Sequence, residues 1–146
     1  MNNINLQIRK ATKDDIDFLL DLRIKTMTEH LINSHFPTDK ESHLKRIHHS
    51  FDNANIIIWY GQPMGLLKAA YEKDKIEIIQ LQIHPDFQGR GFGKQILEII
   101  IEESLLSQIP VFLSVLKTNP AQKLYFRAGF RIIEENEHSF IMQFSK

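Results

Sequence analysis

The stretch Gln88-Gly89-Arg90-Gly91-Phe92-Gly93-Lys94 decides the fold, because it joins an apolar run that ends at His84-Pro85 to a second, longer apolar run. Residues 76–83 predict a strand, which the proline ends because it cannot continue a ladder. Residues 91–106 predict a mostly buried helix. Three glycines between them let several backbone N–H groups converge at the N-terminus of that helix, and such a nest holds a phosphate. Arg90 and Lys94 add positive charge there, although a turn that merely connects strand and helix has the same composition.

The spacing of these glycines excludes two common phosphate loops. A dinucleotide-binding Gly-x-Gly-x-x-Gly loop would need glycine at position 94, which is a lysine. A P-loop needs Ser or Thr after its Gly-Lys pair, but Gln95 follows here, and Gln88 stands where the opening glycine belongs. A different nucleotide-bearing ligand is therefore expected.

Composition narrows the class of protein. A chain of 146 residues predicts a single domain over 1–146. Eighteen basic residues balance eighteen acidic ones, so no basic field would attract nucleic acid or an anionic membrane. The absence of cysteine means that any acyl transfer must proceed without a cysteine nucleophile. No signal peptide or run of 18 apolar residues is present, which predicts a cytoplasmic protein without a membrane segment.

The remaining periodicities predict an α+β fold: a mixed, mostly antiparallel sheet flanked by helices in the order β-α-α-β-β-β-α-β-α-β-β. Thr12 is expected to cap the first helix, and Thr38 with Glu41 has the spacing of a capping box for the second. The expected strands are 6–9, 56–60, 64–71, 76–83, 111–116, 130–133 and 140–144, and the expected helices are 13–30, a short one after residue 38, 91–106 and 120–127.

Two segments and the element order resemble one family. The segment from His84 to Lys94 is similar to the acetyl-CoA signature Gln/Arg-x-x-Gly-x-Gly/Ala of the GNAT superfamily of N-acetyltransferases. The segment from Asn119 to Phe130 resembles that family's Asn-x-x-Ala-x-x-x-Tyr-x-x-x-Gly-Phe region. One departure is that Asn119 lies six residues before Tyr125, where the family has seven. A contact of Asn119 with coenzyme A is thus open, and the alternative is a cap for the helix that Pro120 begins.

The resemblance implies an enzyme that moves an acetyl group directly from acetyl-CoA to a primary amine of a small molecule or a protein N-terminus, without a metal. A homodimer through the final strands is consistent with it. Two alternatives are a CoA-binding sensor without turnover and an acyltransferase for a longer acyl group, for which Gly65 is a candidate small residue. The implied cofactor-binding residues are Leu81, Gln82 and Ile83, on a strand that splays at a bulge and pairs with pantetheine, then Gln88, Gly89, Arg90, Gly91, Phe92, Gly93 and Lys94 for the pyrophosphate, and Asn119.

The resemblance also implies two catalytic residues. An amine acceptor must lose a proton, and Glu77 matches the position of the general base in some members. It could equally be an outward-facing residue of a charged hairpin, with a water chain as the base. Tyr125 matches the residue that protonates the departing thiolate, and a neutral phenol suits that role. The alternative for Tyr125 is an aromatic residue packed in the core.

The histidines do not predict a metal site. His43 and His48 are five residues apart, and His48 and His49 point about 100° apart on a helix, so no paired face forms. His84 is expected to be structural. Residues 13–50 should wall the acceptor side; Glu29, His30, His35 and Phe36 lie there, and none is singled out as a ligand.

Overall fold

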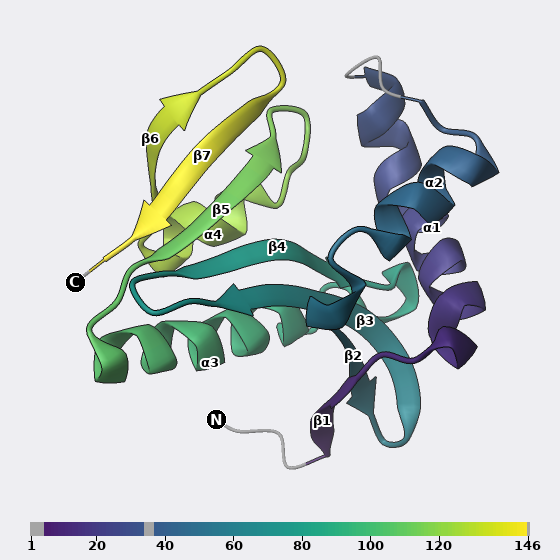
Figure 1. Ribbon diagram of the computed structural model, residues 1–146, viewed down its shortest axis with the longest axis horizontal. Coiled ribbons are helices and arrows are strands. Elements are labelled where there is room, and N and C mark those ends of the chain that lie inside the picture. Colours follow the sequence, from purple (N-terminus) through teal and green to yellow (C-terminus); the bar gives the residue numbers. More distant parts are fainter. Residues whose placement is uncertain (1–4, 34–36, 146) are drawn as a thin grey trace.

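One seven-stranded sheet with helices on both faces forms the body of the protein. The computed structural model describes residues 5–33 and 37–145, and the strand order is β1-β2-β3-β4-β5-β7-β6 (Figure 1). The predicted fold class and element order are confirmed. None of the helices in these ranges is both long and apolar enough to cross a membrane. The elements are β1 (Leu6–Lys10), α1 (Ile16–Asn33), α2 (Lys40–His48), β2 (Ala54–Trp59), β3 (Gln62–Tyr71), β4 (Ile76–Ile83), α3 (Phe92–Ser107), β5 (Val111–Leu116), α4 (Gln122–Ala128), β6 (Arg131–Glu135) and β7 (Ser139–Phe144).

The centre of the sheet opens between β4 and β5, its only parallel pair within the described ranges. These strands pair over three residues each, and the last pair is Ile78 with Leu113. The register of β3 against β4 shifts at this point, since Lys68 pairs with Gln80 and Ala69 with Ile78, which leaves Ile79 as an extra residue. Such a bulge bends its strand and increases the local twist. β4 and β5 therefore diverge, as the expected splay at a bulge requires (Figure 1).

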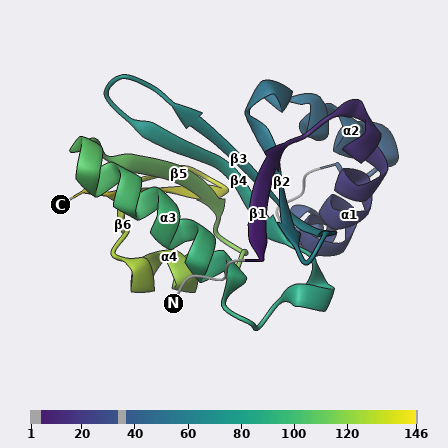
Figure 2. The same ribbon diagram turned by 90° about the horizontal axis from the view of Figure 1, so that it is seen from below.

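Alternating side chains divide the core into two layers. Ile57 of β2 and Ile78 of β4 pack with Ile96 of α3, whereas Ile56 packs with Leu19 of α1 on the other face. Successive residues of a strand point to opposite faces, so a sheet covered on both sides needs continuous apolar runs. Figure 2 shows α1 and α2 across the sheet from α3 and α4.

The predicted N-terminal cap is confirmed before α1 and is wrong for α2. Thr12 caps the 3₁₀ turn that leads into α1, in a capping box with Asp15. For α2 the predicted cap Thr38 is wrong, because the N-cap is Asp39, whose Oδ2 accepts from Ser42 N at 3.2 Å. Its carboxylate also favours the positive end of the helix dipole, which a Thr hydroxyl does not.

A buried lysine fixes α2 to the sheet. Lys68 of β3 is fully buried, and its Nζ donates to the carbonyl oxygens of Arg46, Ile47 and His49 at 3.0, 2.9 and 2.6 Å. These carbonyls end α2 and lack partners within the helix. Burial, with the charges of Arg46 and Arg23, lowers the pKa of Lys68 to about 8, so it still carries its charge at neutral pH. These hydrogen bonds from Lys68 fix the end of α2, and with it the backbone of Arg46.

Candidate active site

The glycine segment forms a nest of unpartnered amides at the start of α3. Gly89 and Gly91 have φ of 79° and 82°, a conformation that favours glycine. The first helical hydrogen bond runs from Gln95 N to Gly91 O at 3.0 Å, so the amides of the residues before Gln95 have no acceptor within the helix. A Cβ built on Gly89 or Gly91 meets no atom within 4 Å, so the space beside the nest is open. The geometry suits an anion.

The side chains of this segment hold the nest in place. Gln88 Nε2 donates to Ile83 O at 2.9 Å, which ties the loop to the end of β4. The Arg90 guanidinium lies 5.5 Å from the ring centroid of Trp59 and 5.9 Å from that of Phe87. Both contacts are within cation–π range. The exposed Lys94 lies within 3.9 Å of Glu98. Gln88 therefore positions the loop, and Arg90 supplies fixed positive charge.

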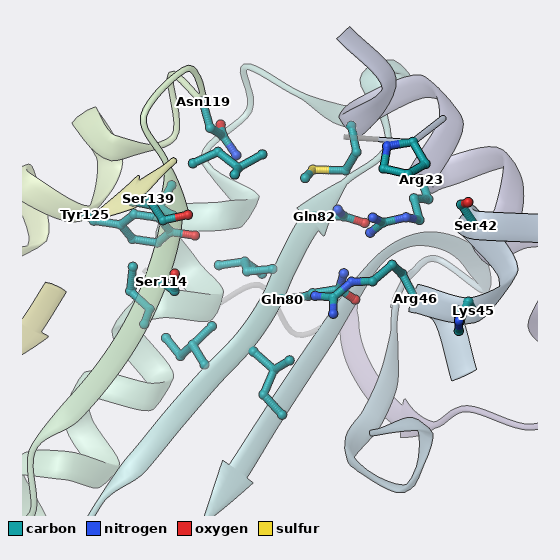
Figure 3. A pocket seen from close by; sticks show the side chains of 18 residues that line it. Arg23, Ser42, Lys45, Arg46, Gln80, Gln82, Ser114, Asn119, Tyr125 and Ser139 are labelled. Atoms are coloured by element: carbon teal, nitrogen blue, oxygen red, sulfur yellow. The ribbon is translucent and has the colours of Figure 1, made fainter. Parts of the chain in front are cut away.

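A cavity of about 590 Å³ fills the opening between β4 and β5. Its walls come from α1 and α2 on one side and from β5, α4 and β7 on the other (Figure 3). Of the residues predicted for the site, Leu81, Gln82, Asn119 and Tyr125 lie on this cavity. The lining consists of Arg23, Met27, Pro37, Ser42, Lys45, Arg46, Ile78, Ile79, Gln80, Leu81, Gln82, Leu113, Ser114, Val115, Leu116, Asn119, Tyr125 and Ser139.

Tyr125 presents a neutral hydroxyl to the cavity. The residue is only 6% exposed, its ring packs against Phe130 with 5.9 Å between centroids, and its hydroxyl points inward (Figure 3). Burial raises the pKa of Tyr125 to about 12, because the phenolate would lose its hydration. The hydroxyl therefore stays protonated at neutral pH and can donate a hydrogen bond or a proton.

Asn119 serves the turn before α4 as well as lining the cavity. Its Oδ1 accepts from Ala121 N at 2.9 Å, which stabilises the turn, but it does not cap α4, whose N-cap is Ala121 and which has no side-chain cap hydrogen bond. The helix itself begins two residues later than Pro120, at Gln122.

Glu77 lies apart from the other predicted residues. It is exposed, pairs with Ala70 of β3 and Phe112 of β5, and precedes the bulge. Its neighbours on β4 are buried against α3, so alternation turns Glu77 to the opposite face. It is absent from the described lining of the cavity. The structure thus does not bring Glu77 and Tyr125 together around one space.

Two of the described histidines, His84 and His43, have structural partners. His84 Nδ1 accepts from Asp86 N at 3.2 Å, and its Nε2 donates to Asp21 of α1 at 3.2 Å. His43 is buried, and its Nδ1 accepts from Arg23 Nε at 3.1 Å. Within residues 5–33 and 37–145 no group of three or more His, Asp or Glu residues could hold a metal ion. His35 and Phe36 lie outside the described residues, as do the side chains of Glu29 and His30.

Sequence reasoning missed the cationic side of the cavity. Arg23 of α1 and Lys45 and Arg46 of α2 line it, together with Gln80 and Gln82 of β4. A signal was present, since Arg23 interrupts the apolar stripe of α1 and the two glutamines interrupt an apolar strand. Periodicity could not show that these positions, far apart in the chain, face one space.

Comparison with known proteins identifies the family. The family model described as acetyltransferase (GNAT) domain matches residues 52–132, more than half of the chain. The chain belongs to the GNAT acetyltransferase family. The matched region holds the nest, the splayed strands and Tyr125, and therefore most of this GNAT domain's cavity. No curated protein matches the sequence.

Solved structures share the fold of this GNAT protein. The PaiA N-acetyltransferase of Thermoplasma acidophilum, solved with coenzyme A, has a TM-score of 0.77 at 16% identity and covers 98% of this chain and 100% of its own. An acetyltransferase of Thermus thermophilus has a TM-score of 0.75 at 21% identity, with 100% of both chains covered. The ribosomal-protein-S18-alanine N-acetyltransferase of Escherichia coli has a TM-score of 0.69 at 17% identity, covering 96% of this chain and 93% of its own. At these identities the likeness concerns the fold alone.

Proposed function

We propose that this GNAT protein transfers an acetyl group directly from acetyl-CoA to a primary amine of a small molecule or a protein N-terminus. The observation that carries the proposal is that β4 borders the cavity into which the protonated hydroxyl of Tyr125 points, and that the chain runs from the end of β4 to the amide nest at α3. The coenzyme A present in the PaiA structure supports the choice of donor.

The donor would lie along the splayed strand. The nest amides from Gly89 to Lys94 take the pyrophosphate, with Arg90 beside them. Beyond Ile78, the described part of β4 has no strand partner on the β5 side, so its backbone groups there can pair with pantetheine as with an added strand. These groups belong to Leu81, Gln82 and Ile83, although Ile83 O already accepts from Gln88. The thioester carbonyl would then lie at the bulge.

The transfer needs one bond formed, one broken and two protons moved. The amine nitrogen attacks the thioester carbonyl carbon, the C–N bond forms and the C–S bond breaks. Tyr125 donates its hydroxyl proton to the departing CoA sulfur and regains a proton from solvent. The amine loses one proton on becoming an amide. A positioned acid or base of this kind supplies about 10²–10⁴-fold in rate.

The remaining role in this mechanism is that of the base that accepts the amine proton. Glu77 stays the candidate, but its exposed position before the bulge means that water must carry the proton from the amine to its carboxylate. No carboxylate or histidine is among the described cavity residues, so water is also the first proton acceptor that the amine meets.

A thiol-release assay tests the proposal. Purified protein is mixed with acetyl-CoA and panels of amines, amino acids, aminoglycosides and peptides, while acetyl-CoA affinity is measured by isothermal titration. Release of CoA with formation of the acetylated amine supports an enzyme. Tight binding without release on any acceptor points to a CoA sensor, and the absence of acetyl-CoA binding refutes both.

A longer acyl donor has less support from the structure. Gly65 does not line the cavity, and a Cβ on it would lie 2.5 Å from Gln82 O. This glycine therefore lets β3 and β4 approach closely and does not make room for an acyl chain. Butyryl-CoA in the same assay should be a poorer donor than acetyl-CoA.

Cytoplasmic location and homodimerisation complete the proposal. All five residues of the edge strand β6 are exposed, and an unpaired edge can add a strand from a second copy. Analytical ultracentrifugation should show a dimer, and a monomer at all concentrations would refute that part.

A further inference from the structure

Arg23 is buried with an unused hydrogen-bond donor. Its side chain comes from α1 into the cavity, yet the residue is only 5% exposed. Nε donates to His43 Nδ1 at 3.1 Å, which fixes the plane of the guanidinium. Among the described residues, Nη1 is buried and has no hydrogen-bond partner. Leaving a charged donor buried and unpaired is costly, so such a group in a native structure calls for a ligand or a functional reason.

The surroundings of Arg23 add positive charge. Lys45 and Arg46 of α2 line the same cavity, and Figure 3 shows Arg23 and Arg46 extending over β4 from the helices. The described lining contains no Asp or Glu, and no described carboxylate pairs with any of these three cations. Burial and the charge of Arg46 lower the pKa of Arg23 to about 10, so the guanidinium remains charged at neutral pH. A chain with zero net charge thus gathers three cations, Arg23, Lys45 and Arg46, around this cavity.

We infer that the cavity binds an acceptor amine that also carries an anionic group, a carboxylate or a phosphate, held by Arg23 and Arg46. This inference rests on the proposed function and names its acceptor class. A planar guanidinium suits bidentate binding of either anion, and Nη1 of Arg23 has no partner among the described residues. Gln80 and Gln82 of β4 lie on the floor of the same space and offer further polar contacts.

Charge complementarity determines how the acceptor would lie in the cavity. Two oxygens of the ligand would satisfy Nη1 of Arg23 and relieve the repulsion between the guanidinium groups. The anion would hold its end of the acceptor at α1 and α2, while the amine extends toward the thioester and Tyr125 on the other side of the cavity. Polyamines, which bring only positive charge, would be repelled by the same residues.

The activity experiment uses acceptors that differ by one group. L-serine and phosphoethanolamine are ethanolamine with an added carboxylate or phosphate, L-phenylalanine is phenethylamine with a carboxylate, and spermidine is the cationic case. The wild-type protein should acetylate the anionic member of each set faster than the parent amine that lacks the anionic group. The comparison of serine with phosphoethanolamine shows whether carboxylate or phosphate is preferred. Arg23→Met and Arg46→Met should raise KM for the anionic acceptor about 10- to 100-fold, the value of a lost charged hydrogen bond. Affinity for acetyl-CoA should change less than about twofold, and exposed Arg131→Met is the matched control.

A binding experiment separates this inference from the proposed function. The melting temperature is measured with malonate or inorganic phosphate against chloride at equal ionic strength, with CoA present. Malonate or phosphate should raise the melting temperature of wild type and of Arg131→Met more than that of Arg46→Met. Arg46 is exposed, so Arg46→Met should fold even if Arg23→Met does not. Preference for ethanolamine, phenethylamine or spermidine, or equal melting in all anions, overturns the inference and leaves the enzyme in place. Anion binding without thiol release on any amine instead keeps the anion site and counts against the proposed function.

Discussion

The donor side and the acceptor side of the proposed site are built from different parts of the chain. The donor side is one contiguous segment whose working groups are backbone amides at the start of α3. The acceptor side consists of side chains from α1, α2 and β4, which come from distant parts of the sequence. Backbone amides are the same in every residue, so under the proposed function they would recognise what all CoA donors share. Side chains differ, so under the proposed function they would select the amine.

Gly91→Glu tests whether the amide nest binds the donor, and a variant that still bound acetyl-CoA would refute this role. The new carboxylate would face the pyrophosphate, and like charges in contact cost several kcal/mol, so affinity should fall by roughly 10³-fold. The positive φ adds a backbone cost of about 1–2 kcal/mol. Gly61→Glu is the matched control, because Gly61 has φ of 77° and open space but lies in the β2–β3 turn. Isothermal titration should show a loss for Gly91→Glu only.

Tyr125→Phe tests whether the far wall of the cavity takes part in chemistry. Turnover should fall by about 10²–10⁴-fold, since the thiolate loses its proton donor, while acetyl-CoA affinity stays within about twofold. Because the pKa of Tyr125 is raised to about 12, wild-type activity should show no loss near pH 10 from its ionisation. Tyr60→Phe, at a 65% exposed tyrosine outside the cavity, is the control. Unchanged turnover in Tyr125→Phe would remove this residue from the mechanism.

Glu77→Gln tests whether Glu77 belongs to the active site. If Glu77 accepts the amine proton through water, turnover at neutral pH should fall by about 10²-fold and recover in part at high pH, where free amine is more abundant. Exposed Glu72→Gln, in the β3–β4 turn, is the control. A pH–rate profile that matches wild type would leave solvent as the base and place Glu77 outside the site.

Asp15→Asn tests how firmly the acceptor wall is attached to the sheet. Asp15 accepts from Arg9 Nη1 and Nη2 of β1 at 2.8 Å each and from Thr12 N at 2.8 Å, just before α1. The hydrogen bond from Arg9 lowers the pKa of Asp15, so its contribution is complete above about pH 4 and is lost as the pH falls through the lowered value. Urea unfolding at pH 7 should show a loss of about 2 kcal/mol. The loss should shrink at pH 3, whereas equal losses at both pH values would contradict the assignment. Exposed Asp74→Asn should have no such effect.

The sequence predicted the fold and the donor side more completely than the acceptor side. The apolar runs at 76–83 and 111–116 predicted the bounds of β4 and β5 directly, because both strands lie between clear turn signals. The cap of α2 was placed one residue early, since Thr38 and Asp39 are both good capping residues and only the backbone conformation separates them. Glu77 was chosen by its place along β4, but it lies before the bulge, where β4 still pairs with β5, and it is not among the described residues that line the cavity.

What the sequence determined by itself is the local chemistry of the donor side: the glycines of residues 88–94 next to a helix start, and a tyrosine at a fixed distance from Gly129-Phe130. Such features depend on neighbours along the chain, so spacing reveals them. The tertiary structure alone decided that Arg23, Arg46 and Lys45 share a cavity without a described carboxylate, and that His43 and Lys68 are buried partners of α1 and α2. Burial and distance between remote elements set the energy of a charge, and neither can be read from the order of residues.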